Sequence, residues 1–209
     1  MRVGRQVYIF IAIVGFIFFV SLVILARLYF KKDGIFFIET DRLILRKFRR
    51  RDKRALSKVF LKNEDVVYFS TWKPIDREGA KKFIRKTFKS YKENGYGQLA
   101  VILKEKGKLI GSCGLHKIKI DGQDLVEMVC QLAKKYCGKG LGTEASKAVR
   151  DYAFRYLYVD TVLSCIHPYN VSSIRVAEKN GMRYLKEGKF LNHHCLVYGI
   201  TRDEWNHLK

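Results

Sequence analysis

The pattern of hydrophobic and polar positions predicts an apolar N-terminal segment followed by interleaved strands and helices. Residues 42–48 alternate as a half-buried strand does, whereas residues 52–62 carry apolar side chains at helical spacing. A second amphipathic helix is expected to begin after Asp76, a typical N-cap, and to end at Asn94-Gly95. Further strands are expected at residues 96–103, 108–118, 125–132, 160–166, 182–185 and 195–200. Helices are expected after a glycine-rich turn, with Ala145, Ala148, Val149, Tyr152 and Tyr156 on one face, and over residues 171–179.

The apolar N-terminal segment is a run of twenty residues without a charge, from Val7 to Ala26. A helix of this length crosses the roughly 30 Å hydrocarbon core of a bilayer. We therefore expect a membrane-spanning helix over about residues 7–29, within an anchor and tether formed by residues 1–35. The alternatives are a buried core helix and a cleaved signal peptide, although a signal peptide has a shorter apolar region that ends in small residues.

Basic residues lie on both sides of this run, and more of them follow it than precede it. This distribution favours a single-pass protein of the cell membrane whose long C-terminal part faces the cytoplasm. The chain has 209 residues, which allows one domain plus an appendage, so we assign residues 36–209 to one domain. Hydrophobic residues make up 48% of the chain and only 2 residues are prolines, which excludes a disordered or collagen-like protein.

Charge points to anionic partners, because 41 Lys and Arg residues against 20 Asp and Glu residues give a net charge of +21. The stretch from Arg46 to Arg54 (RKFRRRDKR) is the densest basic cluster. Three interpretations of it stay open: a solvated helix start, docking to anionic lipid, and contact with RNA or a ribosome. The five cysteines are an odd number without metal-ligand spacing, so we expect free thiols in a reducing compartment and no metal site.

The most informative segment is a glycine-rich turn that opens a helix, KKYCGKGLGTEA from Lys134. Gly138, Gly140 and Gly142 allow backbone N–H groups to approach a phosphate, and Lys139 adds a charge. A Walker loop would need a lysine before Thr143, and a dinucleotide fingerprint would need GxGxxG in a parallel unit. A turn whose glycines serve backbone geometry alone is the remaining alternative.

Five blocks in order resemble the GNAT superfamily of acetyl-CoA-dependent N-acetyltransferases, and within it the branch of the ribosomal-protein-alanine N-acetyltransferases. The resemblance covers about residues 38–206. The blocks are ETDRLILRKF (39–48), KLIGSCGL (108–115), YCGKGLGTEA (136–145), NVSSIRVAEKNGM (170–182) and LVYGITRDEW (196–205).

The resemblance implies a mixed α/β fold with a mostly antiparallel central sheet flanked by helices and splayed between its fourth and fifth strands, where the pantetheine arm of acetyl-CoA inserts. It implies that the pyrophosphate lies on the loop and that Asn170 contacts the pantetheine arm or the reacting centre. The implied cofactor-binding residues are Cys137, Gly138, Lys139, Gly140, Leu141, Gly142, Thr143 and Asn170.

Acetyl transfer to an alkyl amine requires a base, because such an amine, with a pKa of about 8 to 10, is largely protonated at pH 7. The resemblance assigns this role to Glu127, and we consider Ser173 for proton delivery to the departing thiolate. Backbone N–H groups near Val129 to Gln131 would stabilise the oxyanion. Alternatively, Glu127 is a surface charge at a strand end, Asn170 is an N-cap and Ser173 is a first-turn residue.

The leading hypothesis is a membrane-anchored enzyme that transfers an acetyl group from acetyl-CoA to a primary amine, either a protein N-terminus or a small molecule. The alternative is a catalytically inactive scaffold of the same fold that binds anionic lipid, RNA or ribosomes through its basic surface.

Overall fold

The structure is a computed structural model that describes residues 37–61, 77–120, 122–190 and 193–208. The chain from Phe36 to Lys209 forms one compact unit. The membrane-spanning helix expected over residues 7–29 lies outside the described residues. Within the described ranges, no helix is both long enough and apolar enough to cross a membrane.

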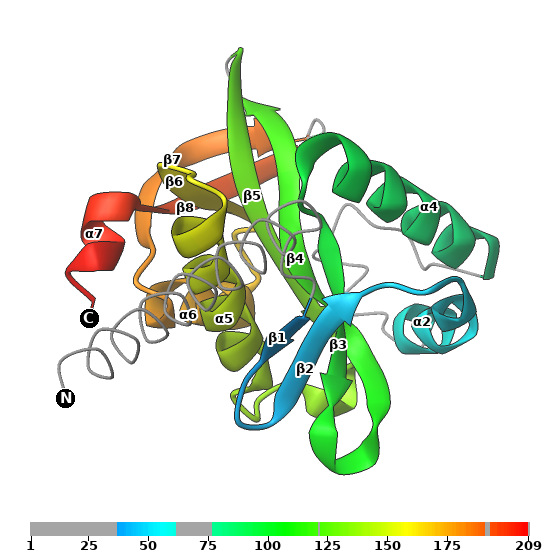
Figure 1. The fold of residues 1–209 in the computed structure, drawn as a ribbon. Coiled ribbons are helices and arrows are strands. Elements are labelled where there is room, and N and C mark those ends of the chain that lie inside the picture. Colours follow the sequence, from blue (N-terminus) through cyan, green and yellow to red (C-terminus); the bar gives the residue numbers. More distant parts are fainter. Residues whose placement is uncertain (1–36, 62–76, 121, 191–192, 209) are drawn as a thin grey trace, which may run out of the picture. The chain divides into compact units, whose positions relative to one another are not determined.

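An eight-stranded sheet forms the centre of the unit, in the order β1-β2-β3-β4-β5-β6-β8-β7 (Figure 1). All neighbouring strands are antiparallel except β5 and β6, which confirms the expected mixed α/β fold with a mostly antiparallel sheet. The strands are β1 Phe37–Glu39, β2 Leu43–Lys47, β3 Gln98–Leu103, β4 Lys108–Ile120, β5 Gln123–Leu132, β6 Thr161–Ile166, β7 Arg183–Phe190 and β8 His193–Thr201.

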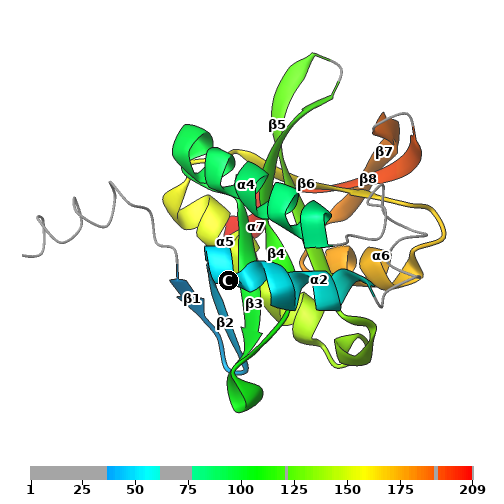
Figure 2. The same cartoon turned by 90° about the vertical axis from the view of Figure 1, so that its right-hand side faces the viewer.

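Helices cover both faces of the sheet, with α2 and α4 on one face and α5 on the other (Figures 1 and 2). Alternation along β3 shows the two faces: Leu99 and Val101 pack in the core beneath α5, whereas Ala100 packs in the cluster formed by α2 and α4. The helices are α2 Lys53–Leu61, α4 Arg77–Asn94, α5 Leu141–Tyr156, α6 Val171–Lys179 and α7 Arg202–Asn206, with 3₁₀ turns η1 Arg50–Asp52, η2 Lys104–Lys106 and η3 Lys134–Tyr136.

One strand and one α-helix were not expected from the sequence, and four strands (β4, β5, β7 and β8) extend further than expected. The strand β1 has only three residues, too few for alternation to be recognised. The helix α7 has Thr201 as its N-cap: the Thr201 hydroxyl accepts from the Glu204 N–H, while the Glu204 carboxylate accepts from the Thr201 N–H. This capping box is a sequence signal that the hydrophobic pattern alone misses. The strands β7 and β8 extend beyond their apolar cores into a polar hairpin.

The sheet opens between β5 and β6, which are the fourth and fifth strands when residues 42–48 are counted as the first. These parallel strands pair only at Val126 with Val162 and at Glu127 with Leu163. Beyond these pairs, the Ser164 hydroxyl donates to the Met128 carbonyl oxygen at 2.9 Å. Because parallel strands end at the same edge, the segments that follow β5 and β6 lie on either side of this opening.

Candidate active site

The segment that follows β5 forms the glycine loop, in which only two of the three glycines need a left-handed backbone. Gly138 and Gly140 both have φ of 74°, whereas Gly142 lies in the first turn of α5. The first N–H bonded within the helix is that of Glu144, which donates to the Gly140 carbonyl oxygen at 3.0 Å. The earlier amides therefore have no acceptor inside the helix. With the helix dipole, they provide a site that fits a phosphate group.

The side chains of the loop differ in their exposure to solvent. Leu141 is 3% exposed and anchors the start of α5 in the core. Cys137 is exposed, and its Sγ lies 3.8 Å from the carbonyl oxygens of Leu132 and Ala133. The side chains of Lys139 and Thr143 lie on the exposed and half-buried surface of the loop. Their expected contacts with the cofactor stay predictions.

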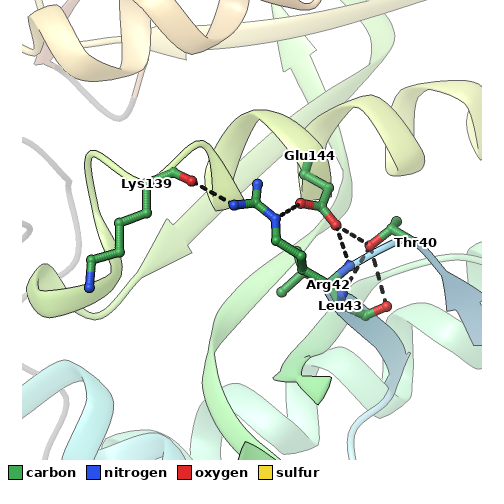
Figure 3. Close-up of polar contacts among 5 residues, drawn as sticks. All are labelled: Thr40, Arg42, Leu43, Lys139 and Glu144. Atoms are coloured by element: carbon green, nitrogen blue, oxygen red, sulfur yellow. Dashed lines mark hydrogen bonds and ion pairs between the residues drawn. The ribbon is translucent and has the colours of Figure 1, made fainter. Parts of the chain in front are cut away.

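A cluster of hydrogen bonds, which we call the Arg42 clasp and define as Thr40, Arg42 and Glu144, joins this loop to the turn between β1 and β2 (Figure 3). The Glu144 Oε1 atom accepts from the Thr40 hydroxyl at 2.6 Å and from the Arg42 backbone N–H at 2.9 Å. The Arg42 guanidinium donates from Nε to Glu144 Oε2 at 2.7 Å and from Nη1 to the Lys139 carbonyl oxygen at 2.9 Å. Sequence patterns did not indicate this cluster, because about a hundred residues separate its two halves.

Glu127 is the last residue of β5 that pairs with β6, at the point where the sheet opens, and only 5% of it is exposed. Burial raises the pKa of its carboxyl group to about 7, although hydrogen bonds from the backbone and thiol of Cys165 act in the opposite direction. It is therefore not the exposed strand-end charge of the alternative interpretation. A carboxyl group with this pKa changes its protonation state near neutral pH, as a general base must.

Two further residues, not identified from the sequence, surround Glu127. His116 is its direct partner across the β4–β5 ladder, so both side chains lie on the same face. Burial lowers the pKa of His116 to about 4, which keeps its ring neutral at pH 7. Burial and the nearby Glu127 carboxylate raise the pKa of the Cys165 thiol, so this thiol donates to Glu127 and is a poor nucleophile. All five cysteines are free, as expected.

On the other side of the opening, Asn170 and Ser173 form the start of α6. The Asn170 Oδ1 atom accepts from the Ser173 N–H at 3.1 Å, so Asn170 is the N-cap of this helix. The side chain of Val176 in α6 lies close to the start of α5, 3.9 Å from the position of a Cβ atom on Gly142. The expected roles of Asn170 at the cofactor and of Ser173 in proton delivery stay predictions.

The basic stretch from Arg46 to Arg54 is not one uniform surface. Arg46 turns inward and donates from both terminal nitrogens to the buried Asp52 carboxylate, at 2.7 and 2.9 Å. This bidentate pair holds η1 against β2. Four arginines of the stretch remain exposed, namely Arg49, Arg50, Arg51 and Arg54. Arg46 is therefore not one of the exposed charges of this stretch, and its expected contact with lipid or a ribosome stays a prediction.

Comparison with known proteins identifies the family to which the fold belongs. Residues 42–183 match the family described as an acetyltransferase (GNAT) domain. The chain is 33% identical over 162 residues to the uncharacterised protein YkkB of Bacillus subtilis, an alignment that covers 76% of this chain and 92% of YkkB.

Two solved structures have the same fold. A GNAT acetyltransferase from Bacillus anthracis superimposes with a TM-score of 0.69 and 26% identity, covering 80% of this chain and 99% of its own. The ribosomal-protein-S5-alanine acetyltransferase from Vibrio fischeri has a TM-score of 0.69 and 19% identity, covering 81% of this chain and 98% of its own.

Proposed function

The chain belongs to the GNAT family of acetyltransferases, whose members use acetyl-CoA, and we propose that it transfers the acetyl group to a primary amine at the opening between β5 and β6. The observation that carries this proposal is the position and burial of Glu127. Its carboxyl group lies where the sheet opens, on the same strand that leads to the glycine loop, and its pKa is raised to about 7. The proposal therefore assigns the base for the amine and the site for the donor phosphates to one strand and its extension.

In the proposed reaction Glu127 accepts a proton from the acceptor's ammonium group, directly or through water. The neutral nitrogen then forms a bond to the acetyl carbonyl carbon, and the carbon–sulfur bond breaks. The CoA thiolate takes up a proton from the Ser173 hydroxyl, which we propose as donor. The acceptor nitrogen restores this hydroxyl with the second proton that it loses as the amide forms, and the proton on Glu127 passes to solvent. A pKa of about 7 for the base suits this step, because it is ionised in a large fraction of molecules at neutral pH.

The carbonyl oxygen gains negative charge during the attack, and we propose that backbone amides of residues 129–131 stabilise it. Here β5 pairs with β4 along one edge, through Val129 with Gly114 and Gln131 with Ser112. Successive N–H groups of a strand point to alternate edges, so at least one amide of this segment faces the opening. Such an amide is held in place before the reaction begins.

We propose a protein N-terminus or a small-molecule amine as the acceptor. A protein N-terminus as acceptor is supported by the similar fold of the Vibrio fischeri enzyme, whose name describes it as an acetyltransferase of an alanine in ribosomal protein S5. The net charge of +21 disfavours a polycationic acceptor, because like charges repel on approach.

We also propose that the chain is held in the cell membrane by a helix over about residues 7–29, with residues 36–209 in the cytoplasm. The support is the uncharged run from Val7 to Ala26. The exposed arginines 49–51 and 54 would then contact anionic lipid, or a ribosome near the membrane. Resistance to alkaline carbonate extraction tests the anchor, since extraction of the whole chain into the soluble fraction would contradict it.

The enzymatic proposal is tested by CoA release from acetyl-CoA with a set of N-terminal peptides and small amines, with Glu127→Gln measured in parallel. We expect release with at least one amine and a loss of about 10²- to 10⁴-fold in kcat/KM in the variant. No release with any amine, together with salt-sensitive binding of polyanions, would instead favour the inactive scaffold.

A further inference from the structure

Resting on acetyl-CoA binding at the glycine loop, we propose that Arg42 and Glu144 are positioning residues for the phosphates of the donor. The Arg42 clasp fixes the peptide between Lys139 and Gly140 so that the Gly140 N–H points into the phosphate site. The two residues come from segments far apart in the sequence, and the Arg42 guanidinium donates both to the Glu144 carboxylate and to the Lys139 carbonyl oxygen (Figure 3).

The orientation follows from the geometry of the peptide group. No described peptide bond is cis, and in a trans peptide the C=O and the N–H point in opposite directions. Arg42 Nη1 donates to the Lys139 carbonyl oxygen at 2.9 Å. The Gly140 N–H therefore points away from Arg42, and rotation of this peptide would break that hydrogen bond.

The peptide that follows Gly140 is held by Glu144, the residue whose carboxylate also binds Arg42. The Gly140 carbonyl oxygen accepts from the Glu144 N–H at 3.0 Å, while the Glu144 side chain binds Arg42. Gly140 is thus held on both sides, with φ of 74°, a conformation that glycine adopts without strain. The guanidinium packs against this glycine, because a Cβ atom there would lie 3.4 Å from Arg42 Nη2.

Glu144 is ionised in the clasp at neutral pH. Burial opposes ionisation of Glu144, but hydrogen bonds from Thr40 and Arg42 outweigh it and lower the pKa of the carboxyl group. The Arg42 side chain is 50% exposed. Within the part of the chain that the structure describes, its Nη1 and Nε atoms are bound to the loop and to Glu144, whereas its Nη2 atom has no protein acceptor.

A substitution at Glu144 distinguishes positioning of the loop backbone from simple electrostatic attraction of the phosphates. A carboxylate near the pyrophosphate repels it, so an account based on charge alone predicts that Glu144→Gln binds CoA more tightly. Our proposal predicts the opposite, because the neutral amide loses the pair that holds Arg42 on the loop. Freeing the backbone of one residue corresponds to roughly a tenfold change in an equilibrium constant. We expect the Kd for CoA to rise about tenfold.

The experiment is calorimetric titration of CoA into the full chain in detergent, for the parent, Glu144→Gln and Arg42→Lys. Arg42→Lys keeps the charge but loses the two-nitrogen contact that Figure 3 shows. We expect both variants to bind CoA about tenfold more weakly. In activity assays, the KM for acetyl-CoA should rise while kcat is largely kept.

A matched control exists at the other end of the sheet. The Glu204 carboxylate accepts from a threonine hydroxyl, a backbone N–H and an arginine Nε, which are the same three kinds of donor that bind Glu144. Glu204→Gln should leave the Kd for CoA unchanged. Equal or tighter binding by Glu144→Gln would overturn the clasp proposal alone. Absence of CoA binding in the parent would overturn the proposed function and the clasp with it.

Discussion

The buried carboxyl group of Glu127 gives stability a pH dependence that can be measured without knowing the acceptor. Its pKa is raised from 4.5 to about 7, chiefly by burial, at a position 5% exposed to solvent. The folded protein therefore retains this proton at pH values where the unfolded chain has released it. Such a group contributes stability that is fully present below about pH 4.5 and is lost as the pH rises through about 7.

The size of this effect follows from the shift. The pKa rises by about 2.5 units, and one unit corresponds to about 1.4 kcal/mol, so ionising Glu127 costs about 3 kcal/mol in the folded state. Glu127→Gln imitates the protonated carboxyl group and cannot ionise. Relative to the parent, the variant should therefore gain about 3 kcal/mol of unfolding free energy between about pH 4 and about pH 9.

The assay is urea unfolding of the full chain in detergent at a series of pH values, for the parent and Glu127→Gln. Glu105→Gln serves as the control for loss of one negative charge, since the Glu105 side chain is 74% exposed. Parallel pH dependences of the parent and Glu127→Gln would refute the reasoning. In that case Glu127 ionises as an ordinary carboxylate, and its assignment as a base poised near neutral pH loses its physical basis.

Three further predictions concern stability. Asp151→Ala removes the carboxylate that accepts from the buried Arg150 guanidinium at 2.6 and 2.9 Å, and leaves it, among the described residues, only the Asn180 carbonyl oxygen. The unfolding free energy in urea titrations should fall by about 3 to 5 kcal/mol, because a buried charge loses its charged partner; a loss near zero would contradict this. The pKa of Glu204 is lowered to about 2, chiefly by the hydrogen bond from the Thr201 N–H. Glu204 therefore contributes stability that is lost as the pH falls from about 4.5 through about 2, and an acid unfolding curve that is unchanged in Glu204→Gln would contradict this. Gly138→Ala should lower the unfolding free energy by about 1 to 2 kcal/mol, because alanine is strained at the φ of 74°. The new Cβ atom meets nothing within 4 Å, so no steric clash adds to this cost, and thermal unfolding that matches the parent would exclude the backbone strain.

Local signals in the sequence were sufficient for most of the secondary structure. The helix expected over residues 171–179 is α6 itself, because Asn170 caps its start and Gly181, with φ of 75°, follows its end. Strand boundaries were less accurate where polar residues continue a ladder, as at Arg183–Phe190 in β7. There the hydrogen bonds to β8 extend the strand, and no apolar alternation marks it.

Candidate site residues were predictable only as far as local motifs reach. The glycine loop and the N-cap Asn170 are local and could be read from their neighbours. The raised pKa of Glu127 depends on burial where the sheet opens, and the position of His116 depends on the register of β4 and β5. The Arg42 clasp depends on tertiary contact between the start of the domain and α5.

The most direct test of the central claim is calorimetric titration of acetyl-CoA into the parent and Gly142→Asp. A Cβ atom at Gly142 meets only side chains at 3.9 Å, and this glycine is not among those with positive φ, so the substitution is compatible with the fold. A carboxylate in the first turn also suits the helix dipole, yet it repels a pyrophosphate held there. We predict saturable binding in the parent and none in the folded Gly142→Asp variant. Equal binding by both proteins, or binding by neither, would contradict a donor site at this loop.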